Sequence, residues 1–264
     1  MTSRETLRAT FEQVPELYDR ARPTYPAEVI EDLVDLAQLR PGARVVEIGP
    51  GTGQATVALA ERGLAVVGVE LGEGLGAFAR DKLARFPQVE IVTAAFEEWE
   101  SDEAAFDAVV AFTAWHWLDP EVKYAKSAQL LRDGGALAVV EVAHVLVPGG
   151  DPFWVEVQED YDEIVPDPEN RPSPFADEVG DLRAEIEASG YFGEIEVRRH
   201  RWDVTYTAEE WIAVMSTYSP HLARDPAIRA RLFDRIRARI DSRPGGRVTK
   251  HYLATLNVAR ASRA

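Results

Sequence analysis

The chain contains no cysteine and has few basic residues for its length. Without cysteine it can form no disulfide, use no thiol nucleophile and bind no metal through thiolates. Its 29 Lys and Arg residues face 45 Asp and Glu residues, which gives a formal net charge of −16. Because binding to phosphate-rich partners requires a basic surface, this balance disfavours nucleic acids and anionic membranes as partners.

Long apolar runs are also absent. Nowhere do 18 apolar residues follow one another, and the opening residues Met1–Glu5 resemble no signal peptide. The expectation is therefore a cytoplasmic protein, a monomer or homodimer. A chain of 264 residues, 46% of them hydrophobic, suits one large α/β domain, alone or with a small cap.

One stretch organises the sequence. The apolar run Val45–Ile48 is followed by glycines at alternate positions, Gly49, Gly51 and Gly53, and then by a helical pattern. This pattern is typical of a buried strand that ends in a tight turn, where a ligand can approach bare backbone. Gln54 stands where the dinucleotide fingerprint G-x-G-x-x-G has its last glycine, which disfavours a nicotinamide-dependent oxidoreductase.

Two acids accompany the turn. Glu47 lies within the first apolar run, and Glu70 ends the next one, Ala65–Val69. A carboxylate about 20 residues beyond a glycine turn is placed to accept hydrogen bonds from a ribose diol.

Acid, glycine turn and second acid together resemble the cofactor site of class I S-adenosylmethionine (SAM)-dependent methyltransferases. Phe106-Asp107, which opens the fourth expected strand, and the Gly134-Gly135 turn before the fifth are similar to that family too. The resemblance implies a Rossmann-like, doubly wound α/β fold, with a seven-stranded, mostly parallel sheet, an antiparallel last strand and a helical cap. It implies SAM as cofactor and S-adenosylhomocysteine as product.

Within the family, the chain looks most like the small-molecule group that includes trans-aconitate methyltransferases, through Phe96, Glu97, Trp99 and the His116-Trp117 pair. Many relatives carry an Asp that holds the adenine amine where this chain has Ala95, so that contact comes from backbone or Glu97, or is absent. Phe96 packs either on the adenine or in the core. The cofactor residues that the resemblance implies are Tyr18, Arg22, Glu47, Gly49, Gly51, Thr52, Gly53, Gln54, Glu70, Leu71, Ala95, Phe96, Ala111 and Phe112.

Proline and glycine punctuation divides the chain. Residues 1–147 are expected to form an N-terminal arm and the SAM-binding core, residues 148–190 a helical cap insertion, and residues 191–264 the final strands with a second cap-forming segment at about 205–240. The cap is expected to be mobile and to close over the methyl acceptor. The arginines between Ile228 and Ile240 are expected to form the solvated side of a helix.

Methyl transfer from a sulfonium is an in-line displacement, to which a protein contributes alignment and exclusion of water. A general base is needed for a protonated hydroxyl, amine or carbon acceptor, whereas a carboxylate acceptor needs none. His116, on the loop after the fourth strand, is the first candidate base and His144 the second. Tyr25, Trp115 and Trp117 are candidates for binding the acceptor. No metal is expected, because Asp107, Asp119 and Glu141 form no evident ligand set.

The sequence therefore predicts a SAM-dependent methyltransferase that acts on a small molecule by O-, N-, C- or carboxyl methylation. A SAM-fold binding protein or a non-methylating enzyme is the main alternative, because a fold does not fix a function. A nicotinamide-dependent oxidoreductase is the less favoured one. The sequence does not identify the acceptor.

Overall fold

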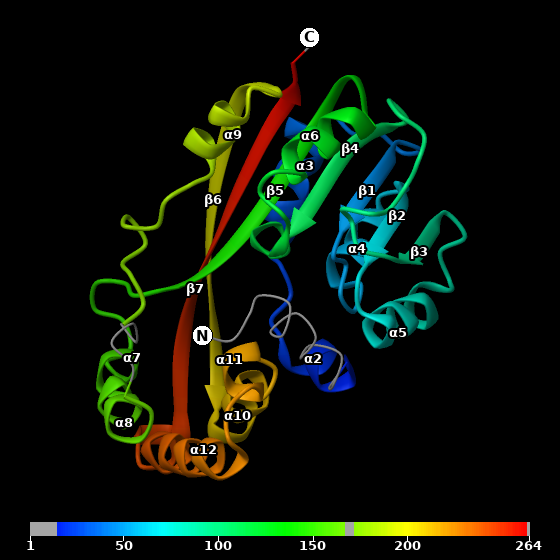
Figure 1. The fold of residues 1–264 in the computed structure, drawn as a ribbon. Coiled ribbons are helices and arrows are strands. Elements are labelled where there is room, and N and C mark those ends of the chain that lie inside the picture. Colours follow the sequence, from blue (N-terminus) through cyan, green and yellow to red (C-terminus); the bar gives the residue numbers. More distant parts are fainter. Residues whose placement is uncertain (1–14, 167–171, 263–264) are drawn as a thin grey trace. The chain divides into compact units, whose positions relative to one another are not determined.

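A computed structural model describes residues 15–166 and 172–262 of the chain (Figure 1). The start of the expected N-terminal arm, including Phe11, and five residues of the expected cap insertion lie outside the described residues.

A seven-stranded sheet in the order β3-β2-β1-β4-β5-β7-β6 forms the framework (Figure 1). Strands β1 to β5 pair in parallel, and the last strands run antiparallel, so the predicted Rossmann-like fold is confirmed. The strands are β1 (Arg44–Ile48), β2 (Ala65–Glu70), β3 (Val89–Thr93), β4 (Phe106–Phe112), β5 (Leu131–Val145), β6 (Phe192–Thr207) and β7 (Arg247–Ala261).

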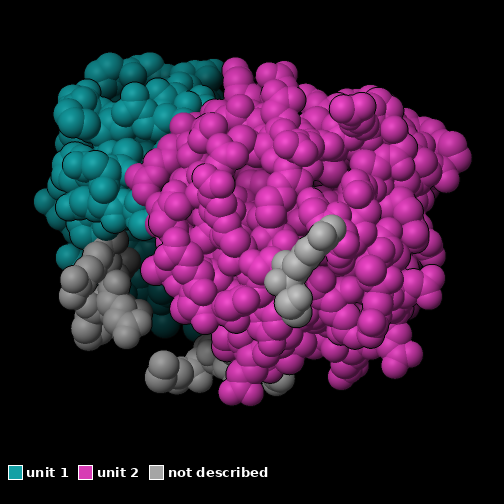
Figure 2. Space-filling model, turned by 90° about the horizontal axis from the view of Figure 1, so that it is seen from above, with its two compact units in different colours: residues 1–23, 143–180, 201–253 teal, residues 24–142, 181–200, 254–264 magenta. Residues whose placement is uncertain are grey.

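Compact packing divides the chain into two units, coloured separately in Figure 2. The first comprises residues 1–23, 143–180 and 201–253, and the second comprises residues 24–142, 181–200 and 254–264. Strands β5, β6 and β7 each begin in one unit and end in the other. They are the longest strands of the sheet, and each contributes residues to both units.

The second unit contains the parallel strands and the helices that cover them. These helices are α3 (Ala27–Leu36), α4 (Gln54–Glu61), α5 (Glu73–Leu83), α6 (Lys123–Leu130) and α9 (Arg183–Ser189). Apolar side chains of β1, β4 and β5 pack with Leu130 of α6 and Ile186 of α9, whereas Ala79 and Leu83 of α5 pack on Ile91 of β3. The near-continuous apolar strands are explained by this burial, since a parallel sheet is covered by helices.

The first unit is built from the remaining helices and the other parts of the three long strands. Its helices are α2 (Pro15–Ala21), α7 (Phe153–Glu156), α8 (Gln158–Ile164), α10 (Ala208–Met215), α11 (Ser219–Leu222) and α12 (Pro226–Asp241). A capping box starts α10: the Thr207 side chain accepts from the amide of Glu210, whose carboxylate accepts from the amide of Thr207.

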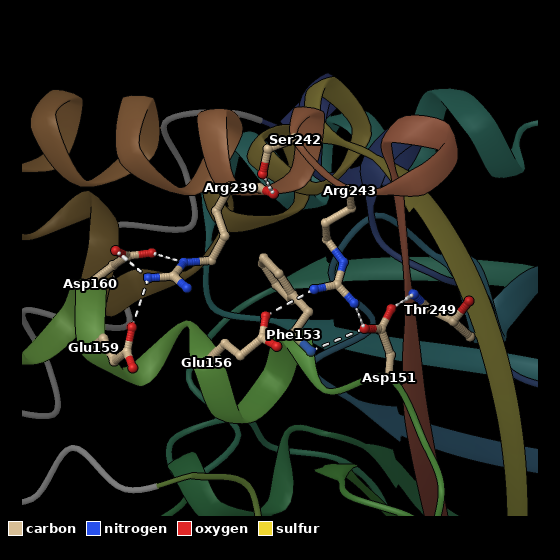
Figure 3. Close-up of polar contacts among 9 residues, drawn as sticks. All are labelled: Asp151, Phe153, Glu156, Glu159, Asp160, Arg239, Ser242, Arg243 and Thr249. Carbon is tan, nitrogen blue, oxygen red and sulfur yellow. Dashed lines mark hydrogen bonds and ion pairs between the residues drawn. The ribbon is translucent and has the colours of Figure 1, made fainter.

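The arginines of α12 were predicted to form its solvated side; Arg231 and Arg235 are exposed as predicted, whereas Arg239 is only 25% exposed. Arg239 forms a two-point ion pair with Asp160 of α8, with distances of 2.5 and 2.9 Å (Figure 3). Arg235 and Arg231 bind Glu163 of the same helix. Periodicity shows which side of a helix is apolar, but it cannot show that an acidic helix lies beside the polar side.

A second ion pair lies just beyond α12. Arg243 binds Asp151 and, at 2.9 Å, Glu156 of α7 (Figure 3). Asp151 also accepts hydrogen bonds of 3.0 Å from the amides of Phe153 and Thr249, so it joins the start of α7 to β7 within the first unit.

Among residues 15–166 and 172–262, no helix is both long and apolar enough to cross a membrane.

Candidate active site

The glycine turn lies at the carboxyl end of β1. Gly49, Gly51 and Gly53 have φ angles of +61°, +59° and +77°, so the three alternate residues all adopt the left-handed conformation that glycine tolerates. The turn closes through the amide of Gly53, which donates to the carbonyl of Pro50 at 2.8 Å, and α4 begins at the next residue.

The three glycines differ in their surroundings. A β-carbon on Gly49 would lie 2.8 Å from that of Ala114, and one on Gly53 would lie 2.9 Å from a methyl group of Leu83. A β-carbon on Gly51 would meet nothing within 4 Å. Packing therefore closes the Gly49 position, whereas the neighbour of Gly53 is the flexible end of Leu83, and Gly51 faces open space that a ligand could fill.

Glu70 ends β2 beside this turn. Its Oε2 accepts a hydrogen bond of 2.8 Å from the amide of Gly51, and its Oε1 accepts one of 2.9 Å from the amide of Gly72. The carboxylate thus joins the glycine turn to the start of α5, a role that sequence reasoning missed. The signal was available, since parallel pairing of neighbouring strands places their carboxyl ends together. Carboxylate oxygens accept more than one hydrogen bond, so the predicted ribose contact remains chemically compatible.

Glu47 is the buried acid of the turn. Its side chain is 1% exposed, and its Oε2 accepts no hydrogen bond from the described residues. Burial raises the pKa of Glu47 to about 7; the Thr56 side chain opposes the rise, and the negative charge of Glu70 adds to it. A buried carboxylate oxygen without a partner is costly, so this group is prepared to receive a hydrogen-bond donor.

Other predicted cofactor residues surround the turn. Thr52 is buried with its hydroxyl unpartnered among the described residues, Gln54 begins α4, and Leu71 is 42% exposed. Ala111 and Phe112 end β4 with buried side chains. Any contact that Ala111 makes with a cofactor would therefore come from its main chain.

The residues that follow β3 are held by internal contacts. The Glu97 carboxylate accepts from the amide of Asp119 at 3.1 Å, and the Glu97 carbonyl accepts from Lys126. Phe96 is packed in the core. The predicted adenine contact, from the backbone near Ala95 or from Glu97, therefore stays a prediction.

The loop after β4 begins with an unusual backbone. Thr113 has a φ of +53°, which a β-branched residue rarely adopts. Its amide donates to Val140 of β5 at 2.8 Å, and its hydroxyl lies 2.7 Å from that of Tyr25, whose ring packs on Phe112. Such strain persists only where surrounding contacts impose it, and it is common at functional sites. Sequence reasoning did not single out Thr113.

His116 lies on this loop, in the short 3-10 helix η2 (Trp115–Trp117). Its side chain is 50% exposed, and its Nδ1 lies 3.2 Å from Oε2 of Glu141 on β5. The ring of Trp117 lies beside the imidazole, with centroids 5.0 Å apart. Trp115 instead packs in the core and donates to Tyr124. Its ring is therefore buried beneath the loop surface and is not available to an acceptor.

The other predicted residues belong to the first unit. The guanidinium of Arg22 stacks on Tyr218 at 4.1 Å and on Tyr18 at 4.9 Å, and it donates to the hydroxyl and carbonyl of Thr217. His144 accepts from or donates to the Tyr218 hydroxyl at 3.0 Å. Burial lowers the pKa of His144 to about 3, and the charges of Lys250 and Arg22 add to the fall. His144 is therefore neutral at pH 7 and a weak proton acceptor.

No group of three or more His, Asp or Glu side chains within residues 15–166 and 172–262 could hold a metal ion. Metal independence of the reaction remains a prediction.

Comparison with known proteins gives one consistent class. Residues 46–139 match the model of the methyltransferase domain family. The chain is 28% identical to an uncharacterised methyltransferase of Mycobacterium tuberculosis over 257 residues, which cover 92% of this chain and 90% of that protein. The match spans both units.

Solved structures share the fold. A protein of Anaeromyxobacter dehalogenans, described as a candidate type II methyltransferase, superposes with a TM-score of 0.66 at 20% identity, covering 90% of this chain and 97% of that one. Phosphoethanolamine N-methyltransferase 2 of Haemonchus contortus, solved with S-adenosylhomocysteine, superposes with a TM-score of 0.55 at 15% identity, covering 95% of this chain and 58% of that one.

Together, the sheet order, the glycine turn and the match of residues 46–139 to the methyltransferase domain family support a class I SAM-dependent methyltransferase. The assignment to methyl transfer also disfavours the nicotinamide alternative. None of the relatives named here is a trans-aconitate methyltransferase, so that finer resemblance stays a prediction.

Proposed function

We propose that this protein transfers the methyl group of SAM to a small-molecule acceptor at the carboxyl ends of β1, β2 and β4. SAM bound there supplies a methyl group on a sulfonium sulfur. The observation that carries the proposal is the contact between Gly49 and Ala114, because it sets the glycine turn directly against the loop that bears His116. A donor seated on the turn and an acceptor seated at His116 would then be neighbours.

The residues of the turn fit the donor. The unpartnered Oε2 of Glu47 would accept from the ammonium of the methionine moiety, which also favours the charged form of this carboxylate. The open space at Gly51 would admit the ligand to bare backbone. Glu70, which already accepts from two amides, would also accept from the ribose hydroxyls, because a carboxylate accepts several hydrogen bonds.

A small acceptor is supported by charge. A net charge of −16 opposes binding to the polyanionic backbone of a nucleic acid. The acids Glu47, Glu70 and Glu141 lie at the same edge of the sheet, so their negative charge also opposes the binding of phosphates there.

Two measurements test the proposal. Titration calorimetry should detect binding of SAM and S-adenosylhomocysteine, and NAD serves as the control that should not bind. A panel of metabolites that carry hydroxyl, amine or carboxylate groups is then incubated with SAM labelled in its methyl group. Label transfer to a panel member with release of S-adenosylhomocysteine supports the proposal; SAM binding without transfer to any class would contradict it.

A second candidate follows from Ala95. Because no carboxylate stands at that position, adenine recognition departs from the family's pattern, and the chain could bind SAM without transferring its methyl group. The same labelled-methyl experiment separates this binding or non-methylating role from the proposed one.

A further inference from the structure

The pairing of His116 with Glu141 joins two neighbouring strands of the sheet. Strands β4 and β5 pair in parallel up to Phe112 and Val140, so Glu141 is the first residue beyond the pairing and faces the loop that follows β4. His116 Nδ1 and Glu141 Oε2 are 3.2 Å apart. Both residues belong to the second unit, and both lie at the edge where the glycine turn ends β1.

This contact determines which nitrogen of His116 carries hydrogen. A carboxylate can only accept a hydrogen bond, so Nδ1 must be the donor. The lone pair of the neutral imidazole then lies on Nε2, on the far side of the ring from Glu141. A carboxylate in this position also stabilises the imidazolium that forms when Nε2 takes a proton, because the two charges are adjacent.

The second oxygen of Glu141 restricts the acceptor. Oε1 is shielded from solvent and accepts no hydrogen bond from the described residues. Two other titratable residues lie near the pair. Burial raises the pKa of Tyr124, and the charges of Glu185 and Glu141 add to the rise. Lys123 is ion-paired with Glu185 at 2.8 Å. No described cation neutralises Glu141 apart from His116 when it is protonated. A carboxylate acceptor would add a second negative charge here, whereas a hydroxyl or amine would bring a hydrogen.

We propose that Glu141 is a positioning residue that fixes His116 as a base at Nε2, and that the acceptor is a hydroxyl or amine compound and not a carboxylate. This inference rests on the proposed function. In the step, the acceptor oxygen or nitrogen forms a bond to the methyl carbon while the carbon–sulfur bond breaks, and that electron pair stays on sulfur. The acceptor's hydrogen passes as a proton to Nε2 of His116, which becomes an imidazolium beside Glu141.

The tautomer of His116 tests the inference without any turnover. Nitrogen NMR of the five histidines, with His116 assigned by its disappearance in His116→Gln, should show hydrogen on Nδ1 and a bare Nε2 in the neutral form. Glu141→Ala should lose this preference, and Glu187→Gln, which changes an exposed acid of α9, should keep it. Hydrogen on Nε2 in the unaltered protein would overturn the inference.

Kinetics provides the second test. With a hydroxyl or amine acceptor, Glu141→Gln should lower kcat at least tenfold and leave the affinity for SAM unchanged, because His116 loses the partner that holds hydrogen on Nδ1. Glu141→Asp should recover part of the rate.

The outcomes separate the two proposals. Methyl transfer only to carboxylates, with Glu141→Gln fully active, would overturn the role of Glu141 and leave the proposed function standing. Absence of methyl transfer to every acceptor class, with the Nδ1–H tautomer present, would overturn the proposed function instead, and with it the acceptor class inferred here.

Discussion

Gly49 and Ala114 approach so closely that a β-carbon on Gly49 would lie 2.8 Å from the β-carbon of Ala114. The two residues follow adjacent parallel strands: Gly49 is the first residue after β1, and Ala114 is the second residue after β4. Their contact therefore sets the spacing between the turn proposed to hold the methyl donor and the loop proposed to hold the base.

Replacement of Gly49 by Ala should lower the free energy of unfolding by more than the positive φ of this residue alone would cost. An added methyl group at a φ of +61° costs about 1 kcal/mol, and the clash with Ala114 adds about 1–3 kcal/mol. The matched control is Gly134→Ala, where φ is +73° and a β-carbon would meet nothing within 4 Å. Denaturant unfolding should show the larger loss for Gly49→Ala; equal losses would contradict the packing role.

Replacement of Gly51 by Ala should abolish SAM binding with little further loss of stability. Its β-carbon meets no protein atom, so the folded chain bears only the cost of the positive φ, about 1 kcal/mol. Calorimetry would measure SAM affinity beside thermal unfolding, again with Gly134→Ala as the control. Normal affinity in a folded Gly51→Ala variant would show that the ligand does not approach the turn at this residue.

Glu47 should make stability fall as pH rises. Its pKa is about 7 in the folded chain and 4.5 ordinarily, so the folded state binds more protons between these values. The free energy of unfolding should therefore decrease as pH increases from about 4.5 to 7, by about 3 kcal/mol at most. Glu47→Gln removes this dependence and should gain stability relative to the unaltered chain as pH is raised from 5 to 8.

The control for Glu47 is Glu90→Gln, which changes an exposed acid of β3. A difference between Glu47→Gln and the unaltered protein that does not vary with pH would show that Glu47 is not a buried, proton-binding carboxyl. If Glu47 receives the ammonium of SAM, saturating SAM should also reduce the pH dependence, because the cation favours the ionised carboxylate.

Asp160 should be essential to the packing of α8 on α12 in the first unit. It is 2% exposed and receives two hydrogen bonds from Arg239, so Asp160→Asn should lower the free energy of unfolding by about 2–3 kcal/mol. Glu163→Gln is the matched control, since its carboxylate is 52% exposed and pairs with two exposed arginines; the expected loss is below about 1 kcal/mol.

Salt distinguishes the two pairs further. The effect of Glu163→Gln should vanish in 1 M salt, whereas that of Asp160→Asn should largely persist, because buried pairs are screened less. Unfolding curves at low and high salt would check this. Equal sensitivity of both variants to salt would show that the Asp160–Arg239 pair behaves as a surface contact.

The strands and the glycine turn could be predicted from the sequence because both are local. Apolar runs such as Val45–Ile48 indicate buried strands, and only glycine suits three alternate left-handed residues. The partners of Glu70 and His116 could not be predicted in the same way, since each contact joins residues that are distant in the chain. A charged residue, Glu141, inside the apolar stretch Ala138–Val145 was the available signal.

The residues that sequence reasoning placed less well are those whose burial depends on neighbouring elements. Trp115 and Trp117 directly precede and follow His116, yet Trp115 packs in the core and Trp117 does not. The two side chains differ in burial because the 3-10 helix η2 turns them in different directions, and residue spacing in the sequence does not predict this helix. Tyr18, Arg22 and His144 lie in the first unit. Arg22 stacks on Tyr18 and on Tyr218, and Tyr218 is hydrogen-bonded to His144.

During synthesis, the order of the strands has its own consequence. The ribosome has added every residue of the proposed site once it has passed Glu141. Asn257 of β7, which accepts from the amide of Leu182 and donates to the carbonyl of Val139, is added more than 100 residues later. At that stage the nascent chain contains the glycine turn and β5, but not β7, which is the next strand in the sheet after β5. Until β7 has been synthesised, the edge of β5 that pairs with β7 in the folded sheet has no partner, and an unpaired apolar edge favours aggregation with other chains.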